Sequence, residues 1–292
     1  MEAVLEELKQ ITEENKPNRT FLKWAGGKTK ILSKILKHFN PSKRFVEPFL
    51  GGGSVFLNVK YDKYLINDIN PDLSLIWSCI KERGPFFLER CCSLFTEENN
   101  KKDKYYELRE KFNELEKNKK FRKYDVERAS LFLYLNKHCW NGLCRYSIKN
   151  NIRKFNVPYA NYKSVNCPTD QLHFCQSYLN KNHVTIENKH FKEIFDMVKP
   201  GDMIYCDPPY IPISDTACFT AYAGGEFTED DHSDLLEESH KAAANGCKVV
   251  ISNSFCDKTQ KLYEGLNYEE IKVIRNIGKG ELVKELIVTL GD

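Results

Sequence analysis

The chain has 292 residues, of which 41% are hydrophobic and 12% aromatic, a composition that allows a sizeable core and argues against disorder. Its 44 Lys and Arg exceed its 41 Asp and Glu by only three, so the total charge neither favours nor excludes a polyanionic partner. No apolar run approaches the roughly 20 residues that cross a bilayer, and residues 1–18 lack the apolar stretch of a signal peptide. We therefore expect a cytoplasmic protein with no membrane partner.

The eleven cysteines and seven histidines lack the spacings of a disulfide framework or a zinc site, because C-x-x-C and H-x-x-x-H are both absent. We expect reduced, mostly buried cysteines and no metal.

Short β-rich runs alternate with helical patterns along the chain. An N-terminal helix with an apolar stripe is predicted before Pro17. The predicted strands are Arg44–Glu47, Tyr64–Asn67, Val184–Ile186, Met203–Cys206, Lys248–Ser252, Tyr268–Val273 and Glu285–Leu290. The predicted helices among them include Thr29–Phe39, Pro71–Ile80 and Glu229–Ala244, the last with a capping box of Thr228 and Asp231. This alternation predicts an α/β fold. The last two strands, joined by a short polar stretch, are expected to pair antiparallel at one edge of the sheet.

The middle of the chain has a different character. Residues 101–128 are highly charged and helix-like, and Ala129–Leu135 is an apolar helical segment. No Asp or Glu occurs from Ala129 to Thr169, which is typical of a surface that faces a polyanion. The six cations of this stretch are Lys137, Arg145, Lys149, Arg153, Lys154 and Lys163. We interpret residues 84–170 as an inserted, mainly helical domain.

The first chemical candidate is the glycine turn Gly51–Gly53, which follows a predicted strand and precedes a predicted helix. Glycines there permit positive φ and let a ligand approach the backbone closely. Phe56 stands where a dinucleotide fingerprint or a hydrolase elbow requires glycine, and Leu22 where a P-loop requires it. Taken alone, the turn is also compatible with a structural role. Asp68, after the next strand, is well placed to accept from a ribose diol at the same sheet edge.

The second candidate, Asp207-Pro208-Pro209-Tyr210, directly follows the predicted strand Met203–Cys206. Two prolines fix φ and remove two donors, which leaves carbonyl acceptors in a defined place. Asp207 adds a charged acceptor and Tyr210 a flat face. The set suits a planar heterocycle with an exocyclic amino group. The alternative is that the prolines only stiffen the chain where it leaves the strand. The position at the carboxyl end of a strand, where α/β proteins bind ligands, makes this structural role less favoured.

A third segment, Phe21–Lys28, offers the aromatic surface of Trp24 and the ammonium of Lys28 near glycines. These suit an adenine-type ring and a carboxylate, although a capped loop would account for the segment equally well.

Together these blocks resemble the Dam-type (D12 class) adenine-N6 DNA methyltransferases. The matching blocks are Phe21–Lys28, Glu47–Phe56, Asn67–Asn70, Asp207–Tyr210 and, in the basic middle, Trp140–Tyr146, Phe155–Tyr159 and Tyr162-Lys163. The resemblance covers the chain from Phe21 to about Leu290. It implies a Rossmann-like S-adenosylmethionine-dependent methyltransferase sheet (residues 1–83 and 171–292) with an inserted, mainly helical target-recognition domain (residues 84–170).

The resemblance also implies roles for individual residues. The implied S-adenosylmethionine site consists of Trp24, Lys28, Phe49, Gly51, Gly53, Asp68 and Asp207. The implied catalytic residues are Asp207, Pro208, Pro209 and Tyr210, with Asp207 and the Pro208 carbonyl accepting both N6–H bonds of a flipped-out adenine that stacks on Tyr210. The implied contacts to double-stranded DNA are Lys23, Trp140, Asn141, Leu143, Arg145, Pro158 and Tyr162.

Arg145 suits bidentate reading of a guanine edge, and Trp140 takes the place of an aromatic residue that enters the base stack. The implied target sequence is GATC. The expected enzyme is a monomer or weak dimer that associates with the nucleoid through DNA, and it acts either alone or together with a restriction nuclease. The chain departs from the family pattern at Ser147, where Asn is common, and at Ala160, where Gly usually follows Val-Pro-Tyr. Residues 147–154 also form a longer loop than usual.

Two other functions are compatible with parts of this pattern. One is an amino-methyltransferase acting on an RNA adenine or a protein glutamine, but protein-directed relatives tend to carry Asn in place of Asp207 and need no basic segment. The other is a catalytically silent DNA-binding protein, which should lose Asp207 or the glycine turn first; both are intact.

Overall fold

The computed structural model describes residues 16–117, 125–150, 152–212, 227–275 and 281–291, and all seven predicted strands are present in it. They are β1 (Arg44–Glu47), β2 (Lys63–Asn67), β5 (His183–Glu187), β6 (Met203–Cys206), β7 (Lys248–Ser254), β8 (Asn267–Arg275) and β9 (Glu281–Leu290). The predicted N-terminal helix and the stretch Asn276–Gly280 lie outside the described residues.

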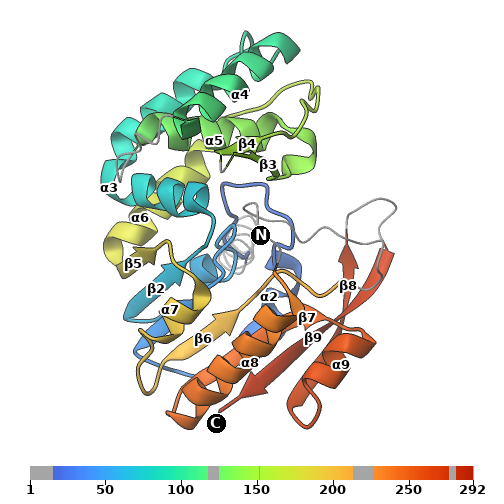
Figure 1. Cartoon of the computed structure of the whole chain (residues 1–292). Helices are drawn as coiled ribbons and strands as arrows, with labels where there is room; N and C mark the ends of the chain where they lie inside the picture. Colours follow the sequence, from blue (N-terminus) through green and yellow to red (C-terminus); the bar gives the residue numbers. More distant parts are fainter. Residues whose placement is uncertain (1–15, 118–124, 151, 213–226, 276–280, 292) are drawn as a thin grey trace, which may run out of the picture.

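The strands form one sheet in the order β5-β2-β1-β6-β7-β9-β8 (Figure 1). The five strands from β5 to β7 run parallel, so their carboxyl ends share one edge of the sheet. The last two strands pair antiparallel, and β8 forms the outer edge, as predicted. This confirms the predicted Rossmann-like α/β fold.

Helices cover both faces of this sheet and build a separate lobe. The α-helices are α2 (Leu32–Leu36), α3 (Pro71–Leu94), α4 (Lys102–Lys117), α5 (Val126–His138), α6 (Thr169–Lys181), α7 (Phe191–Phe195), α8 (Glu229–Ala244) and α9 (Asp257–Leu262). The short 3-10 helices are η1 (Thr29–Ile31), η2 (Phe56–Asn58) and η3 (Trp140–Gly142). The predicted bounds and capping box of α8 are confirmed.

Three helix predictions were partly wrong. The predicted helix Pro71–Ile80 is only the first part of α3, which continues to Leu94. The predicted helix Thr29–Phe39 is a 3-10 turn followed by a short α-helix that ends at Leu36, close to Pro41, which disfavours helical backbone just before it. The helix predicted after the glycine turn is only the three-residue η2. Val55, Phe56 and Leu57 are all buried, so this segment lacks the polar face of a surface helix and fills the core instead.

Alternating side chains along the central strands supply two hydrophobic clusters, one on each face of the sheet. In β7, Val250 belongs to the cluster beneath α2, α3 and α6, whereas Val249 and Ile251 belong to the one beneath α7 and α8. The first cluster continues without a break from Phe45 in the sheet to Phe132 in α5.

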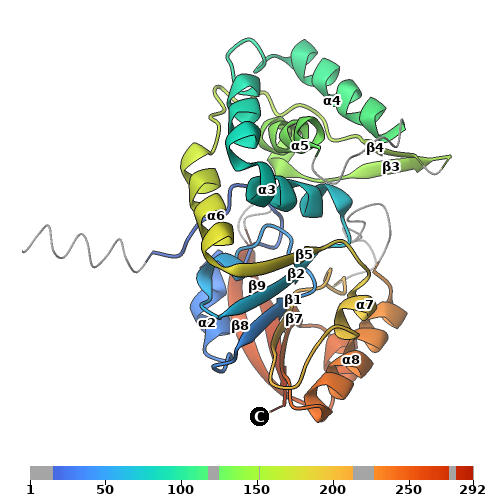
Figure 2. The ribbon, with the colours of Figure 1, turned by 90° about the vertical axis from the view of Figure 1, so that its left-hand side faces the viewer.

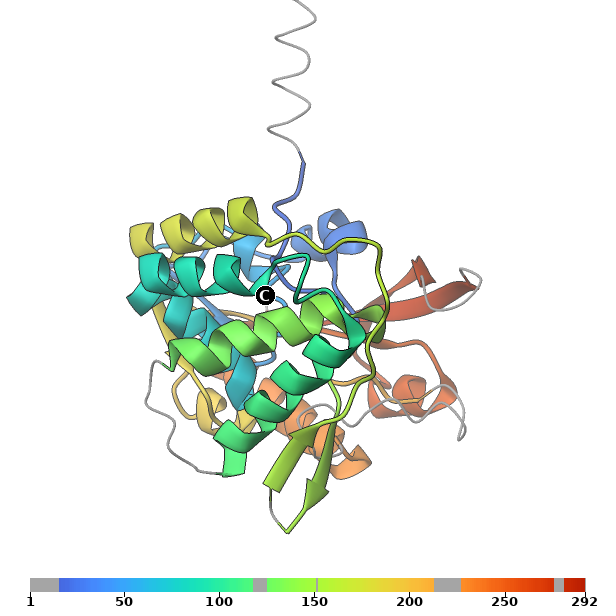
Figure 3. The ribbon, with the colours of Figure 1, turned by 90° about the horizontal axis from the view of Figure 1, so that it is seen from above.

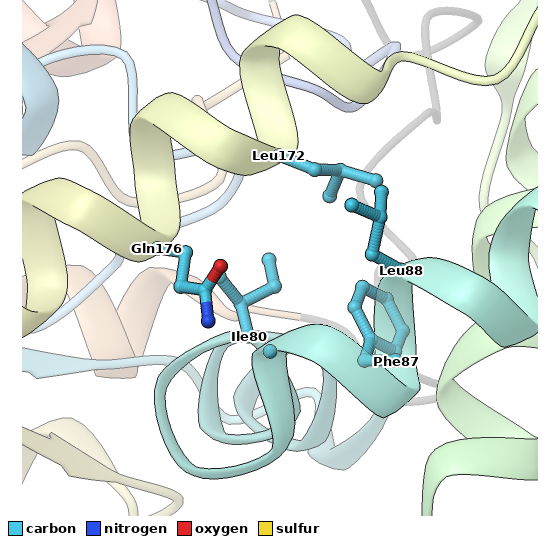
Figure 4. A pocket seen from close by; sticks show the side chains of 6 residues that line it. Ile80, Phe87, Leu88, Leu172 and Gln176 are labelled. Atoms are coloured by element: carbon cyan, nitrogen blue, oxygen red, sulfur yellow. The ribbon is translucent and has the colours of Figure 1, made fainter.

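The long helix α3 joins the sheet to the lobe and is kinked. Arg83 leaves the helical region (φ −130°) just before Pro85, which lacks the backbone donor of a continuous helix. Gly84 lies at this kink, where a Cβ atom would stand 1.7 Å from Nε2 of Gln176 in α6. Figure 4 shows this crossing, where Gln176 lies beside Ile80 and Leu172 lies beside Leu88. The predicted domain border at residue 84 therefore falls inside α3, and the division into two domains stays a prediction.

The lobe consists of α4, α5, the outer half of α3 and a β-hairpin, and it lies above the sheet with α3 between them (Figures 1 and 2). The hairpin pairs β3 (Tyr146–Lys149) with β4 (Ile152–Phe155) and projects from the lobe (Figure 3). Its residues were predicted as a long loop, which was wrong because four-residue strands give little periodic signal. Asn150, with φ 53°, lies at the turn.

Among the described residues, no helix is long and apolar enough to cross a membrane. The described cysteines are all free, and most of them are buried.

Candidate functional site

The glycine turn requires glycine at two positions. Gly51 (φ 51°) and Gly53 (φ 74°) both adopt left-handed backbone. A Cβ atom on Gly51 would lie 2.8 Å from Nε1 of Trp24, and one on Gly53 would lie 2.5 Å from Cζ2 of Trp77. The turn is therefore packed between two indole rings, and Trp24 of the segment before β1 covers it.

Asp68 lies beside this turn, one residue after β2. Its Oδ2 accepts from Gly51 N at 2.8 Å and its Oδ1 from Asn70 N at 2.9 Å. Burial raises the pKa of Asp68 to about 6, although both backbone N–H groups lower it. The structure thus brings together Trp24, Gly51 and Asp68, as the sequence predicted.

Asp207 extends from the end of β6 and forms an ion pair with Lys28 at 2.6 Å. Lys28 is 4% exposed, and its Nζ also donates to Gly26 O at 2.6 Å. Its backbone N donates to Oγ of Ser54 at 3.1 Å, which attaches this segment to the glycine turn. Burial raises the pKa of Asp207, against the lowering effect of Lys28. Within the described residues, Oδ1 of Asp207 is buried without a hydrogen-bond partner, which leaves one carboxylate oxygen for a ligand.

Tyr210 is held from the antiparallel side of the sheet. Its hydroxyl donates to Oε2 of Glu285 in β9 at 3.0 Å, and Nζ of Lys28 lies 4.9 Å from its ring centroid. Burial raises the pKa of Tyr210 well above its usual range, so this hydroxyl stays a donor. The next residue, Ile211, donates to Asn253 at 3.2 Å and accepts from Oγ of Ser254 at 2.7 Å.

Glu47, at the end of β1, was part of a quoted motif but received no predicted role. It is 2% exposed, and its Oε2 has no hydrogen-bond partner among the described residues. Burial, followed by the charge of Asp207, raises its pKa well above the usual range. Glu47 lies near Asp207, Asp68 and the ammonium of Lys28, and Asp207 also lies near Glu285, so carboxyl groups outnumber ammonium groups among the described residues of the site.

Phe49, two residues before Gly51, packs on aromatic side chains. Its ring packs on Phe191 and Phe227, each with its ring centroid 5.6 Å away, in the cluster beneath α7 and α8. Its described contacts are those of a core residue, so its predicted contact with the cofactor stays a prediction.

The lobe is attached to the segment before β1 through Asn136 in α5. Asn136, which is 1% exposed, accepts from Lys23 N at 2.9 Å and donates to Lys23 O at 2.7 Å and Gly142 O at 3.0 Å. Nζ of Lys23 lies 4.0 Å from the ring centroid of Tyr162. Lys23 and Tyr162, two predicted DNA contacts that are far apart in the protein sequence, are thus in direct contact.

The turn η3 carries three further predicted DNA contacts. Trp140 is 54% exposed, and its backbone N donates to Pro158 O at 2.9 Å. Asn141 is exposed with a positive φ of 54°, and Leu143 N donates to Trp140 O at 3.1 Å. An exposed indole on a hydrogen-bonded turn has the form expected of a side chain that inserts between bases.

Arg145 stands at the base of the β3–β4 hairpin. It is exposed, and its Nε donates to Oδ1 of Asn156 at 2.9 Å. This bond uses one of its five donors, so the others stay able to bind an acceptor. Lys149 and Lys163 are also exposed.

One predicted surface cation is not on the surface. Arg153 of β4 bonds to Asp72 at 3.2 Å and to Glu116 at 3.4 Å, which places its charge inside the lobe. The composition of an acidic-free segment could not reveal this, because both carboxylates come from outside that segment.

The structure therefore brings the predicted residues into two groups. One contains Trp24, Lys28, Gly51, Gly53, Asp68 and Asp207–Tyr210 at the carboxyl edge of the sheet; the other contains Lys23, Trp140, Asn141, Leu143, Arg145, Pro158 and Tyr162 on the lobe. Sequence reasoning missed Glu47, Asn136, Asn253 and Glu285. Their common signal is a polar residue in an otherwise apolar strand or helix face.

Comparisons with known proteins show the family to which the chain is similar. The family model described as D12 class N6 adenine-specific DNA methyltransferase matches residues 24–277. A DNA adenine methylase from Serratia marcescens is 38% identical over 268 residues, which cover 91% of this chain and 95% of that protein. One from Escherichia coli strain K12 is 37% identical over 277 residues, covering 93% and 95%. A solved precorrin 8W decarboxylase aligns with 90% of each chain at 10% identity, and its TM-score of 0.36 is too low to inform the function.

Proposed function

The chain belongs to the D12 class N6 adenine-specific DNA methyltransferases, and we propose that Asp207–Tyr210 is its catalytic centre and S-adenosylmethionine its methyl donor. The proposal rests above all on Oδ1 of Asp207. This buried carboxylate oxygen has no partner among the described residues, at the strand end beside the glycine turn.

The residues around the turn fit S-adenosylmethionine. The left-handed Gly51 and Gly53 let Trp24 and Trp77 pack directly on the turn, Trp24 offers a flat apolar face, and the carboxylate of Asp68 suits a ribose diol. Asp207 neutralises the ammonium of Lys28, and the carboxyl group of Glu47 lies near both, so no excess positive charge opposes a cationic sulfonium. When bound, S-adenosylmethionine supplies an electrophilic methyl group on a sulfonium.

Asp207 and Pro208 make the adenine amine reactive. The N6 lone pair is delocalised into the ring, which makes this nitrogen a weak nucleophile. When Oδ1 of Asp207 and the backbone carbonyl of Pro208 accept the two N6–H bonds, the nitrogen is drawn toward tetrahedral geometry and its lone pair is freed. The carboxylate then stabilises the positive charge that develops on N6 during transfer, and it is placed to accept the proton that N6 must lose once it carries the methyl group.

Tyr210 holds the face of the base. Because its hydroxyl is fixed by Glu285 and the following backbone by Asn253 and Ser254, the ring keeps one orientation. Such a preorganised surface aligns the adenine without reordering during the reaction.

The lobe provides recognition. An adenine inside a duplex cannot reach a buried carboxylate, so it must leave the stack, and the exposed Trp140 is suited to fill the gap. Arg145 reads a guanine edge in the major groove, within the sequence GATC that the resemblance implies. Exposed cations of the acidic-free segment, including Lys149 and Lys163, contact phosphates.

The test is Asp207→Ala in single-turnover methyl transfer to a GATC duplex at saturating S-adenosylmethionine. We expect the rate to fall about 100- to 1000-fold, because one preorganised electrostatic contact to the transition state is removed. The matched control is Asp62→Ala, an exposed carboxylate before β2, which should keep the wild-type rate. A rate for Asp207→Ala within about threefold of wild type would overturn the assignment.

The same assay separates the two other functions. Methyl transfer to an RNA or to a protein glutamine that exceeds transfer to duplex DNA would indicate another amino group as the substrate. Binding of DNA with no transfer to any of the three would indicate a silent protein. We expect transfer to duplex DNA alone.

A further inference from the structure

A network of buried charges lies where α3, α4, α5 and the hairpin meet. Asp72, in the first turn of α3, is 1% exposed and bonds through Oδ1 to Nε of Arg128 at 2.7 Å. Nη2 of Arg128 bonds to Glu116 of α4 at 2.7 Å. Arg153 bonds to both carboxylates, at 3.2 Å to Asp72 and 3.4 Å to Glu116. Two carboxylates and two guanidiniums therefore form one electrically balanced group.

Both strands of the hairpin are anchored to this network. From β3, the hydroxyl of Tyr146 donates to Oδ2 of Asp72 at 2.6 Å. From β4, Arg153 reaches the same oxygen, and its guanidinium lies 4.7 Å from the Tyr146 ring centroid. Tyr146 is buried, whereas its neighbours Arg145 and Ser147 are exposed. Its bond thus fixes the backbone next to Arg145.

The same network is connected to the sheet edge through a short stretch of chain. Asn70 accepts from Asp72 N at 3.1 Å, and Asp68 accepts from Asn70 N at 2.9 Å. The Asn70 amide also lies 3.6 Å from Sγ of Cys144, which precedes Arg145. Asp72 therefore lies between the carboxylate proposed for the cofactor and the hairpin proposed for the DNA.

We propose that Asp72, acting through Tyr146, is a positioning residue for target recognition: it sets the angle at which the hairpin presents Arg145 to the DNA. This inference rests on the proposed reading role of Arg145. A buried ion network contributes little net stability compared with apolar packing, but it accepts its partners in only one geometry. That property suits a group whose task is to orient a reading side chain.

The test is Tyr146→Phe. Asp72→Asn would leave two buried guanidiniums with one carboxylate, so its loss of stability would obscure any other effect. Tyr146→Phe instead removes one hydroxyl and keeps the ring, its packing and both arginine pairs of Asp72. The readout is the ratio of kcat/KM for a GATC duplex to that for duplexes changed at one outer base pair. We expect this ratio to fall about tenfold, with an unchanged KM for S-adenosylmethionine.

The matched control is Tyr134→Phe. Tyr134 of α5 is also buried in the lobe and donates to Asn99 O at 2.6 Å, away from the hairpin. The Tyr134→Phe variant should lose about as much free energy of unfolding as Tyr146→Phe, but it should keep the wild-type ratio of kcat/KM values. If Tyr134→Phe lowers the ratio as much as Tyr146→Phe does, the effect is general loosening of the lobe and the inference is wrong.

Arg145→Ala, measured in parallel, separates this inference from the proposed function. We expect it to lower the same ratio by at least as much as Tyr146→Phe. If Arg145→Ala lowers the ratio and Tyr146→Phe keeps it, the positioning role is wrong while the reading role stands. If neither changes it, both are wrong.

Discussion

Asp68 and Asp207, at the ends of the two strands that flank β1, are carboxyl groups held in different ways. Asp68 accepts from two backbone N–H groups, which fix it as an acceptor beside the glycine turn. Asp207 is paired with the ammonium of Lys28 on one oxygen and keeps the other without a partner among the described residues. The first arrangement suits binding, and the second suits contact with a reacting amine.

The pKa of Asp68 gives a pH prediction. Burial raises this pKa to about 6, so the carboxyl gains a proton as the pH falls through 6. In the proposed site the ionised form of Asp68 accepts from the ribose hydroxyls, so affinity for S-adenosylmethionine should be constant above pH 7 and fall by up to about tenfold per pH unit below 6. Calorimetric titration from pH 5 to 8 measures this.

Two variants check the origin of that pH dependence. Asp68→Asn should bind more weakly with a nearly flat profile from pH 5 to 8, and Asp62→Asn should retain the wild-type profile. An equally steep fall in Asp68→Asn would assign the dependence to another group.

At the scale of elements, polar residues on buried faces hold the functional segments in place. Asn253 of β7 and Glu285 of β9 fix the chain around Tyr210. The side chain of Asn136 in α5 hydrogen-bonds to both backbone groups of Lys23, and we call this pair of bonds the Asn136 clasp. Each of Asn253, Glu285 and Asn136 is a buried polar residue on an element that also buries apolar side chains. The partners of each residue are distant in sequence. The hydrophobic pattern of the sequence therefore shows that a polar residue is buried there, but it does not show which group that residue binds.

Asn136→Ala tests this clasp. It leaves two backbone groups of Lys23 and the carbonyl of Gly142 without their buried partner, so the free energy of unfolding should drop by about 1–3 kcal/mol. KM for DNA should rise more than KM for S-adenosylmethionine, because the clasp positions Lys23. Chemical denaturation and steady-state kinetics measure the two effects. Asn180→Ala, at an exposed position of α6, should change neither; equal changes in both KM values for Asn136→Ala would contradict the role.

The elements also show what the sequence could predict. Strands β1 and β6 have the predicted bounds, because short apolar runs between turn signals indicate buried parallel strands. The hairpin of β3 and β4 differs from the predicted loop, because four-residue strands give little periodic signal and the contacts of Tyr146 and Arg153 with Asp72 join residues far apart in sequence. The same reason explains why Arg153 was taken for a surface cation.

The whole molecule separates its charges by function. The total of +3 divides into six cations without an acid from Ala129 to Thr169 and, since 3 − 6 = −3, a mildly acidic remainder. The sheet edge gathers carboxyl groups around Lys28, whereas the lobe presents Arg145, Lys149 and Lys163. This separation suits a cationic cofactor on one side and DNA on the other. The motifs predicted both groups of residues, but only the structure shows how Asn136 and Asp72 join them.

Mapping N6-methyladenine in duplex DNA most directly tests the central claim that this site methylates adenine in GATC. Unmethylated plasmid DNA is incubated with the protein and S-adenosylmethionine, and modified bases are located by sequencing. We predict modification of the adenine in GATC sites on both strands and none with Asp207→Ala. Modification at other sequences would contradict the proposed specificity, and modification that persists in Asp207→Ala would contradict the proposed catalytic centre.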